Sequence, residues 1–421
     1  MLDPVTSSSA PLSPIVDPYL LCLNVTCYRD SSGRRYFDPL WERDLREHVR
    51  YLANLTLASP CRVGEPPPDA IACDPPLHGI RFVDLPAATT RTQALLHLPA
   101  IAARLWREIG RSRIVHLGVA GWPIPFGWTA GPIAVLRRKP FLVIVESAPW
   151  RLHPGMRATP GKRWWARLSE LCAKWCVHRA RLVIVTQEDY SKTLLSRDPS
   201  EAHVIPASWL NDADLISDCD AAESWRAKKL LRGQRLKLLF AGRLVPAKGV
   251  PLLLDAMRRL HRENAPIELD ILGEGELLAE CASLAREMNG AARVNPIGTL
   301  PYGEKFFRAL RPYHAVVVPS LSDEQPRIVY DAFSQAVPVL ASRTPGLQAC
   351  VEEERTGAFA AAFDGDAWAD LFRRSLHRTG ELERMGMAGL ETARAMTLRK
   401  MHERRWRLLL MMIQNGKETF R

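Results

Sequence analysis

Short runs of β-forming residues alternate with longer helical patterns along most of this 421-residue chain. Two of these runs, FLVIVES at 141–147 and RLVIVT at 181–186, carry an unbroken apolar stretch. Unbroken apolar stretches are typical of strands that helices cover on both faces, as in a parallel sheet. The pattern therefore predicts an α/β protein built from doubly wound sheets.

The alternation occurs in two arrays, separated by the polar and charged segment 211–234, which we interpret as a linker. In the first array we expect strands at 18–26, 56–61, 79–85, 113–118, 141–147, 181–186 and 203–207, and helices at 41–53, 92–109, 162–179 and 188–196. In the second we expect strands at 236–242, 267–273, 294–298, 315–320 and 337–342, and helices at 248–262, 275–288 and 327–335. Two such arrays predict two Rossmann-like domains, at 18–210 and 235–395, that face each other across a cleft.

The overall charge is basic, because lysine and arginine exceed aspartate and glutamate by 11. Such a balance favours acidic partners, which are phosphates, nucleic acid or an anionic membrane surface. No known DNA- or RNA-binding module is present, so we expect no nucleic-acid partner. The hydrophobic content of 47% is enough for sizeable cores and excludes a disordered chain.

Nine cysteines, an odd number without any CxxC pair, argue against a disulfide scaffold or a zinc ribbon and indicate a reducing, cytoplasmic location. Residues 1–17 lack the features of a signal peptide and are expected to form a flexible tail. The uncharged stretch 117–136 has the length of a membrane span. Its prolines and glycines fit a strand end, a loop and a short buried helix better.

Polar and glycine residues follow several strands of the second array, at the edge where ligands of parallel sheets bind. Gly242 ends one strand, Arg243 follows it, and Lys248 opens the next helix. Arginine can grip a diphosphate by a forked pair of bonds and lysine as a point charge, although both could equally be solvated surface charges. In LGEGE, Gly275 allows a tight turn beside a ligand, or is simply part of a turn.

The segment 319–342 carries the most specific signal. A strand ends at Ser320, and Pro326 stands where a helix begins, so the free N–H groups from Pro326 through Arg327 to Ile328 would point at an anion. Asp323, before that helix, would accept bonds from sugar hydroxyls or act as an N-cap. Asp331 would accept bonds from a ribose. Its expected position inside the helix is unfavourable for aspartate.

The order GR…KG, GxG, PS…D-x7-D-A and PV-AS is similar to that of a large family of retaining glycosyltransferases of GT-B fold, family 4, also called glycosyl transferases group 1. The resemblance is strong over about residues 236–362. It implies a sugar donor linked to a nucleoside diphosphate of the UDP or GDP type, with no metal and no other cofactor. It also implies that the 235–395 domain binds the donor, that the 18–210 domain binds the acceptor, and that a helix at 396–421 packs back toward the first domain.

By the same resemblance, Arg243 and Lys248 grip the donor diphosphate, and Asp323 and Asp331 stand where the family has two glutamates that contact the donor sugar and the ribose. Each aspartate keeps the charge but has a shorter reach than glutamate. Glu324 would replace Asp323 if the loop shifts by one residue. These departures affect the expected geometry of the donor more than its binding.

Two residues at strand ends of the first array are candidates for the acceptor side. Glu146 stands at the position where the family often has a histidine, and it would stabilise positive charge on the anomeric carbon or accept a proton from the acceptor hydroxyl. Alternatively, it pairs with Arg151. His116, in VHLG, is interpreted as a core or acceptor-side histidine.

The basic charge is concentrated in 151–181 and 394–421. In the first of these segments a helical stripe of Trp164, Trp165, Leu168, Leu171, Cys172 and Trp175 lies beside cations. This pattern is typical of a helix on an anionic membrane, but it would serve equally as a core face.

We therefore expect a retaining, hexosyl-transferring enzyme that moves a sugar from a nucleotide sugar to a glycan or lipid-linked acceptor hydroxyl, in polysaccharide or glycolipid synthesis. It would be cytoplasmic, with the inner face of the cell membrane as a further candidate partner. The alternative is a catalytically inactive scaffold of the same fold.

Overall fold

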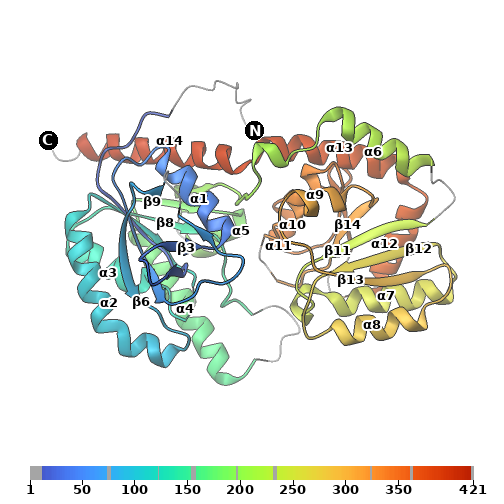
Figure 1. Cartoon of the computed structure of the whole chain (residues 1–421), viewed down its shortest axis with the longest axis horizontal. Helices are drawn as coiled ribbons and strands as arrows, with labels where there is room; N and C mark the ends of the chain where they lie inside the picture. Colours follow the sequence, from blue (N-terminus) through green and yellow to red (C-terminus); the bar gives the residue numbers. More distant parts are fainter. Residues whose placement is uncertain are drawn as a thin grey trace.

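The computed structural model describes residues 12–73, 77–121, 123–152, 158–195, 198–230, 235–322, 325–360 and 364–418. They form two α/β domains that lie side by side (Figure 1). The two sheets, whose central strands are parallel, confirm the predicted fold class.

The N-terminal domain is built on a ten-stranded sheet of order β10-β9-β8-β7-β1-β4-β2-β3-β5, with β6 also pairing with β4. Its strands are β1 (Tyr19–Cys22), β2 (Cys27–Arg29), β3 (Arg35–Phe37), β4 (Leu55–Val63), β5 (Ile71–Ala72), β6 (Arg81–Pro86), β7 (Ile114–Gly118), β8 (Phe141–Val145), β9 (Leu182–Val185) and β10 (Ala202–Val204). Its helices are α1 (Pro39–Val49), α2 (Arg91–Arg111), α3 (Gly127–Leu136), α4 (Pro160–Arg179) and α5 (Glu188–Leu194).

The C-terminal domain has a six-stranded, fully parallel sheet of order β13-β12-β11-β14-β15-β16. Its strands are β11 (Leu236–Ala241), β12 (Ile267–Leu272), β13 (Arg293–Gly298), β14 (Ala315–Val318), β15 (Val339–Ser342) and β16 (Gly357–Ala360). The helices of this half are α6 (Asp218–Leu230), α7 (Val250–Arg262), α8 (Leu278–Glu287), α9 (Glu304–Leu310), α10 (Ile328–Ser334), α11 (Pro345–Gln348), α12 (Gly365–Leu376), α13 (Thr379–Ala395) and α14 (Leu398–Glu418).

The unbroken apolar runs are the central strands of the first sheet. Every residue of β8 and β9 is buried, because helices cover both faces of the sheet at this point. The short strands β2, β3 and β5 were not predicted. They form a partly antiparallel extension of the sheet, and two or three residues are too few to show a period in the sequence.

Two of the expected boundaries are wrong in detail. The segment 211–234 is more than a linker, because α6 buries Trp225 in the core of the C-terminal domain and Trp225 donates to the carbonyl of Ala336 at 2.8 Å. The tail ends earlier than residue 17. Ile15 is 3% exposed, and its backbone bonds to Tyr51.

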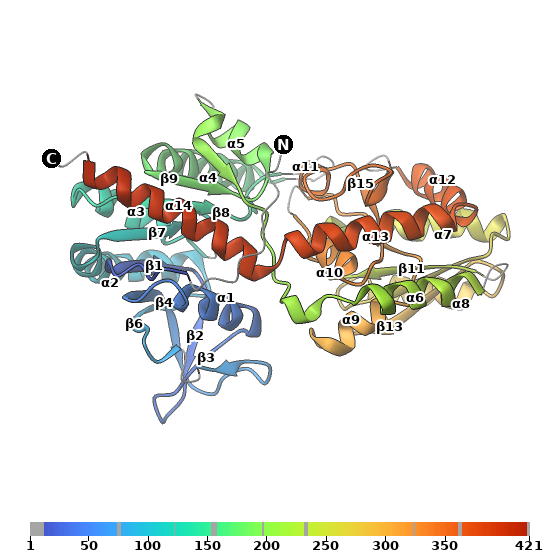
Figure 2. The ribbon, with the colours of Figure 1, turned by 90° about the horizontal axis from the view of Figure 1, so that it is seen from above.

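The last helix connects the two domains. In Figure 2, α13 lies along the C-terminal domain and α14 continues along the N-terminal domain. Leu398, at the start of α14, donates its N–H to the carbonyl of Leu210 at 2.7 Å. Met401 and Leu409 of α14 are buried in an N-terminal core cluster. The final helix of the chain is therefore structurally part of the first domain.

The stretch with the length of a membrane span is divided between the end of β7, a loop and the ten-residue helix α3. Within the described residues, no helix is both long enough and apolar enough to pass through a bilayer.

Gly249 lies directly against the backbone of another loop of the C-terminal sheet. Its φ of 74° is in the left-handed region, and a Cβ there would overlap the carbonyl oxygen of Pro319, which follows β14. We expect Gly249→Ala to destabilise the protein by about 2 kcal/mol or more, because it combines an unfavourable φ with a backbone clash. Urea unfolding measures this effect, with Gly161→Ala, whose Cβ would meet nothing within 4 Å, as the control. Equal stability of the two variants would contradict the close approach.

Candidate functional site

A cavity of about 490 Å³ lies at the carboxyl edge of the C-terminal sheet. Its walls come from the ends of β11, β12 and β14 and from the start of α10. Seven residues singled out in the sequence line it together: Gly242, Arg243, Lys248, Pro326, Arg327, Ile328 and Asp331. The cavity therefore brings three cations and two carboxylates, Asp331 and Glu274, from distant parts of the chain into one place.

Backbone hydrogen bonds between neighbouring loops hold this edge in place. Gly242 donates its N–H to Leu272 at 2.9 Å, Leu244 donates to Glu274 at 2.8 Å, and Gly273 donates to Gly298 at 2.7 Å. Because three successive strand ends are tied together in this way, the side chain of Arg243 extends from a fixed base. Gly275 packs against the backbone of Leu244 and is not among the cavity-lining residues, so its assignment to the donor site is not supported.

Asp331 is 1% exposed and lies in the first turn of α10, not in the middle of a helix as expected. This position removes the objection from helix propensity, because acidic residues are favourable near a helix N-terminus. The hydroxyl of Tyr302 donates to its Oδ1 at 2.9 Å, and Arg327 Nε lies 3.6 Å from its Oδ2. Burial raises the pKa of Asp331 to about 7, although Arg327 and Tyr302 act in the opposite direction.

Tyr302 is a member of this site that the sequence did not reveal. The guanidinium of Arg327 lies 4.4 Å from the centre of its ring, and that of Arg43, from α1 of the other domain, lies 5.7 Å away. Arg43 also lies 3.5 Å from Asp214, which precedes α6. A tyrosine in a turn has no distinctive signal, so only the folded chain shows that it contacts Asp331.

The two acidic positions of the loop before α10, Asp323 and Glu324, lie outside the described residues. Next to them, Gln325 accepts the N–H of Ala207 at 3.1 Å and so connects this loop to the end of the N-terminal domain.

A second cavity, of about 470 Å³, lies at the carboxyl ends of β1, β7 and β8 in the N-terminal domain. Glu146 and His116 both line it, together with Trp41, Asp44 and Arg405. Helix α1 borders this cavity through Trp41 and Asp44, and its Arg43 lies near Tyr302, which donates to Asp331 of the other cavity.

Glu146 pairs with Arg405 of α14 and not with Arg151, so the pairing considered from the sequence is wrong. Arg405 Nη2 lies 3.3 Å from Glu146 Oε1, and its side chain is only 4% exposed. The Arg405 Nε is buried and has no hydrogen-bond partner within the described part of the chain. Burial raises the pKa of Glu146 above its ordinary value, and Arg405 opposes this shift.

Arg151 instead ties α4 to α5. It forms ion pairs with Glu170 at 3.2 Å and Asp189 at 2.8 Å, and it donates to Thr193 at 2.7 Å. These partners are side chains of α4 and α5, so Arg151 stabilises the packing of the two helices and is not assigned to the acceptor side.

His116 belongs to a buried polar cluster beneath the N-terminal cavity. Its Nδ1 lies 3.0 Å from the hydroxyl of Tyr19, and burial, with His48 and Arg405 nearby, holds the pKa of His116 well below its ordinary value. It is therefore uncharged at neutral pH. Asp44, His48 and His402 lie beside it and present ligand atoms within 4.8 Å of one another. Asp44 accepts from His402 at 3.0 Å, and mutual hydrogen bonds account for this cluster without an ion.

The apolar stripe of α4 is divided between exposed residues and residues that are partly buried, namely Trp165, Leu168 and Cys172. Trp164 is 63% exposed, Leu171 66% and Trp175 38%, whereas the buried side of the helix consists of Ser169, Ala173, Cys176 and Val177. The exposed half of the stripe is therefore not a core face, whereas Trp165 packs against Trp128.

Residues 221–392 match the family model described as glycosyl transferases group 1. These residues belong to the glycosyl transferases group 1 family. The chain is accordingly an enzyme of the glycosyltransferase class, and the resemblance noted in its motifs is confirmed.

Relatives and solved structures are consistent with this assignment. The chain is 25% identical over 316 residues to D-inositol 3-phosphate glycosyltransferase of Mycobacteroides abscessus, a match that covers 72% of this chain and 67% of the relative. It is 26% identical to the enzyme of the same name from a Nocardioides species, where the match spans about half of each protein, 52% and 51%.

The glycosyltransferase shares its fold with proteins of known structure. Sucrose-phosphate synthase from Thermosynechococcus elongatus superposes with a TM-score of 0.67 at 19% identity, over 95% of this chain and all of the other. Anabaena HepE in complex with UDP superposes with a TM-score of 0.65 at 14% identity, over 94% of this chain and all of the other. At these identities the likeness concerns the fold alone.

Proposed function

We propose that this glycosyltransferase moves a hexosyl group from a UDP- or GDP-linked donor to an acceptor hydroxyl, with retention of the anomeric configuration. The observation that carries the proposal is the single cavity in which Gly242, Arg243, Lys248 and Asp331 converge. A cavity of this size and charge suits a nucleoside diphosphate, whose phosphates need cations and whose ribose needs a hydrogen-bond acceptor.

In this proposal the reaction breaks the bond between the anomeric carbon and the diphosphate and forms one between that carbon and the acceptor oxygen. Arg243 and Lys248 offset the negative charge that develops on the leaving diphosphate, so these side chains do the work that a metal ion does in other transferases. Asp331 orients the ribose. Retention rests on the family resemblance.

We assign the acceptor to the N-terminal cavity, beside Glu146. A carboxylate whose pKa is raised by burial is suited to accept the proton of the attacking hydroxyl. The relatives named for D-inositol 3-phosphate make phosphorylated polyols the first acceptors to test, ahead of glycans and lipid-linked sugars.

The direct test is incubation with UDP-glucose and GDP-mannose in the presence of D-inositol 3-phosphate and simple glycosides, followed by mass detection of products. Transfer with retention supports the proposal. Failure of the folded protein to bind any nucleoside diphosphate removes it. Tight binding without any turnover would favour the inactive scaffold.

The ion pair between Glu146 and Arg405 leads to a pH prediction. Removing the guanidinium in Arg405→Met takes away the charge that opposes the raised pKa of Glu146, so this pKa rises further. The acidic limb of the kcat/KM profile should move to higher pH, and kcat/KM at neutral pH should fall about 10- to 100-fold. The control is Arg407→Met, which removes an exposed arginine two residues further along α14. An unshifted limb would exclude Glu146 as the group that titrates.

We also propose a peripheral position at the inner face of the cell membrane. The exposed Trp164, Leu171 and Trp175 of α4, interspersed with cations, are suited to an anionic lipid surface. A role in polysaccharide or glycolipid synthesis would place the acceptor at such a surface.

A further inference from the structure

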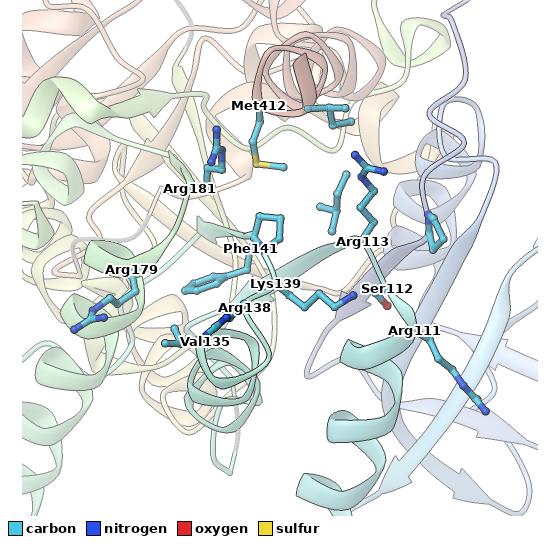
Figure 3. Close-up of a pocket in the computed structure, with 14 residues that line it drawn as sticks. Arg111, Ser112, Arg113, Val135, Arg138, Lys139, Phe141, Arg179, Arg181 and Met412 are labelled. Carbon is cyan, nitrogen blue, oxygen red and sulfur yellow. The ribbon is translucent and has the colours of Figure 1, made fainter. Parts of the chain in front are cut away.

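A further cavity of the N-terminal domain, of about 690 Å³, is larger than the one beside Glu146. It opens at the amino ends of β1, β7, β8 and β9, against the end of α14 (Figure 3). Strand β7 shows the separation from the acceptor cavity, because Ile114 at its start lines this cavity and Gly118 at its end lines the other. Four residue steps of strand place the two about 13 Å apart, on opposite edges of the same sheet.

This basic cavity is lined by six cations and by no acidic residue. The cations are Arg111, Arg113, Arg138, Lys139, Arg179 and Arg181. Two of them are neutralised by carboxylates that lie just outside, since Arg111 pairs with Glu108 and Arg113 with Asp17, each at 3.2 Å. Within the described residues, Arg138, Lys139 and Arg181 have no acidic partner.

Helix ends account for only part of this charge. Helices α2, α3 and α4 all end at this edge, and cations near a helix C-terminus offset its partial negative charge, about half a unit each. Arg111 and Arg179 lie in the last turns of α2 and α4 and point outward in Figure 3, as expected for that role. Lys139 and Arg181 lie beyond the helices, and Lys139 extends across the cavity toward Ser112.

Arg138 has a left-handed backbone conformation just after a helix, where glycine is the usual residue. It follows α3 with a φ of 53°, in the left-handed region, and the next N–H, that of Lys139, bonds back to the carbonyl of Ala134 at 2.9 Å. A side chain there is unfavourable for folding, yet the chain has an arginine at this position. The backbone conformation therefore does not account for an arginine at this position.

The floor of the basic cavity is apolar. Phe141 and Ile114 are each 2% exposed and Met412 is 8% exposed. Next to the lining residues Val135 and Met412 stand Leu136, 72% exposed, and Met411, 50% exposed. The cavity therefore offers both cations and apolar groups, which suits an anion that carries an apolar part.

We propose that the basic cavity is a second ligand site of this protein and that it binds a phosphate ester, separate from the donor and acceptor sites. Arg138, Lys139 and Arg181 are the candidate cations for the phosphate, because phosphate oxygens accept from forked and point-charge donors of this kind. The apolar part lies on Phe141 and Met412. Such a ligand comes either from the headgroup of an anionic phospholipid or from a soluble phosphorylated compound.

The test compares Arg138→Asn/Arg181→Asn with a control of equal charge, Arg262→Asn/Arg286→Asn, two exposed arginines of the other domain. Asparagine tolerates the left-handed conformation at position 138, and all four side chains are exposed, so circular dichroism and thermal melting should show folded proteins. Arg243→Ala/Lys248→Ala identifies phosphate binding at the donor cavity.

In the first arm, pyrophosphate binding is measured by equilibrium dialysis. We expect wild type and control to bind two equivalents, the cavity variant to lose one with at least a tenfold fall in affinity, and Arg243→Ala/Lys248→Ala to lose the other. In the second arm, sedimentation with phosphatidylcholine vesicles is compared with and without phosphatidic acid. Here the cavity variant should bind at least tenfold more weakly than the control.

A defect in the vesicle arm alone identifies a lipid headgroup, and a defect in the dialysis arm identifies a soluble phosphate ester. If the cavity variant matches the control in both arms, the proposal is wrong. Loss of binding only in Arg243→Ala/Lys248→Ala would also overturn the proposal of a second site. The proposed transferase function would still stand, because it depends on the donor cavity alone.

Discussion

Replacing Asp331 by asparagine is expected to stabilise the protein at pH 8 and to reduce transfer activity about 100-fold. In the folded state, burial raises the pKa of this carboxyl to about 7, from an ordinary value of 3.8. An acid whose pKa is raised by folding binds its proton more tightly in the folded state. The free energy of unfolding therefore falls as the pH rises from about 4 to 7, and it stays lower above that.

The expected gain at pH 8 is about 2–4 kcal/mol, since each unit of pKa shift corresponds to about 1.4 kcal/mol. At pH 4 the gain should vanish, because Asp331 is then mostly protonated in the folded protein. Asparagine keeps an oxygen for the Tyr302 hydroxyl but loses the charge that binds the hydroxyls of the ribose, and hydrogen bonds to a charged group contribute about 1.5–3 kcal/mol each.

Urea unfolding at pH 4 and pH 8 and initial-rate kinetics with the donor measure both effects. Asp255→Asn, which removes an exposed carboxylate of α7, is the matched control and should change neither. If Asp331→Asn destabilises the protein at pH 8, the carboxylate is better solvated than its burial indicates. If activity persists, the ribose is held by another group.

Removing both cations of the donor cavity, in Arg243→Ala/Lys248→Ala, is expected to weaken UDP binding about 1000-fold. Each charge-assisted contact to a phosphate contributes about 1.5–3 kcal/mol, and both side chains line the same cavity. Titration calorimetry with UDP checks this directly, with Arg262→Asn/Arg286→Asn as the control for loss of charge.

The single variants should each lose part of this affinity. Should the double variant bind UDP like wild type, the nucleotide does not occupy the cavity at the carboxyl edge of the C-terminal sheet, and the assignment of donor and acceptor to the two domains is wrong. Since UDP can be tested without an acceptor, this result does not depend on which acceptor the enzyme uses.

Much of the fold could be read from the sequence because its main signals are local. The runs that became β8 and β9 are apolar at every position, and β11 to β15 of the C-terminal sheet coincide with predicted strands. The polar residues at strand ends, such as Arg243, could be placed at one edge because parallel strands all end on the same side. The segment 211–234 was interpreted as a linker because α6 is mostly polar and charged. One buried tryptophan, Trp225, gives such a helix only a weak hydrophobic periodicity.

Contacts between distant parts of the chain decided the rest. The sequence alone determined that there are two doubly wound domains and that cations and a carboxylate meet at the edge of the second one, since these follow from period and from strand direction. Only the tertiary structure decided that Arg405 of the last helix, and not Arg151, faces Glu146, and that Tyr302 contacts Asp331. Pairings across 259 and 29 residues depend on how helices pack, and that information is spread over the whole chain.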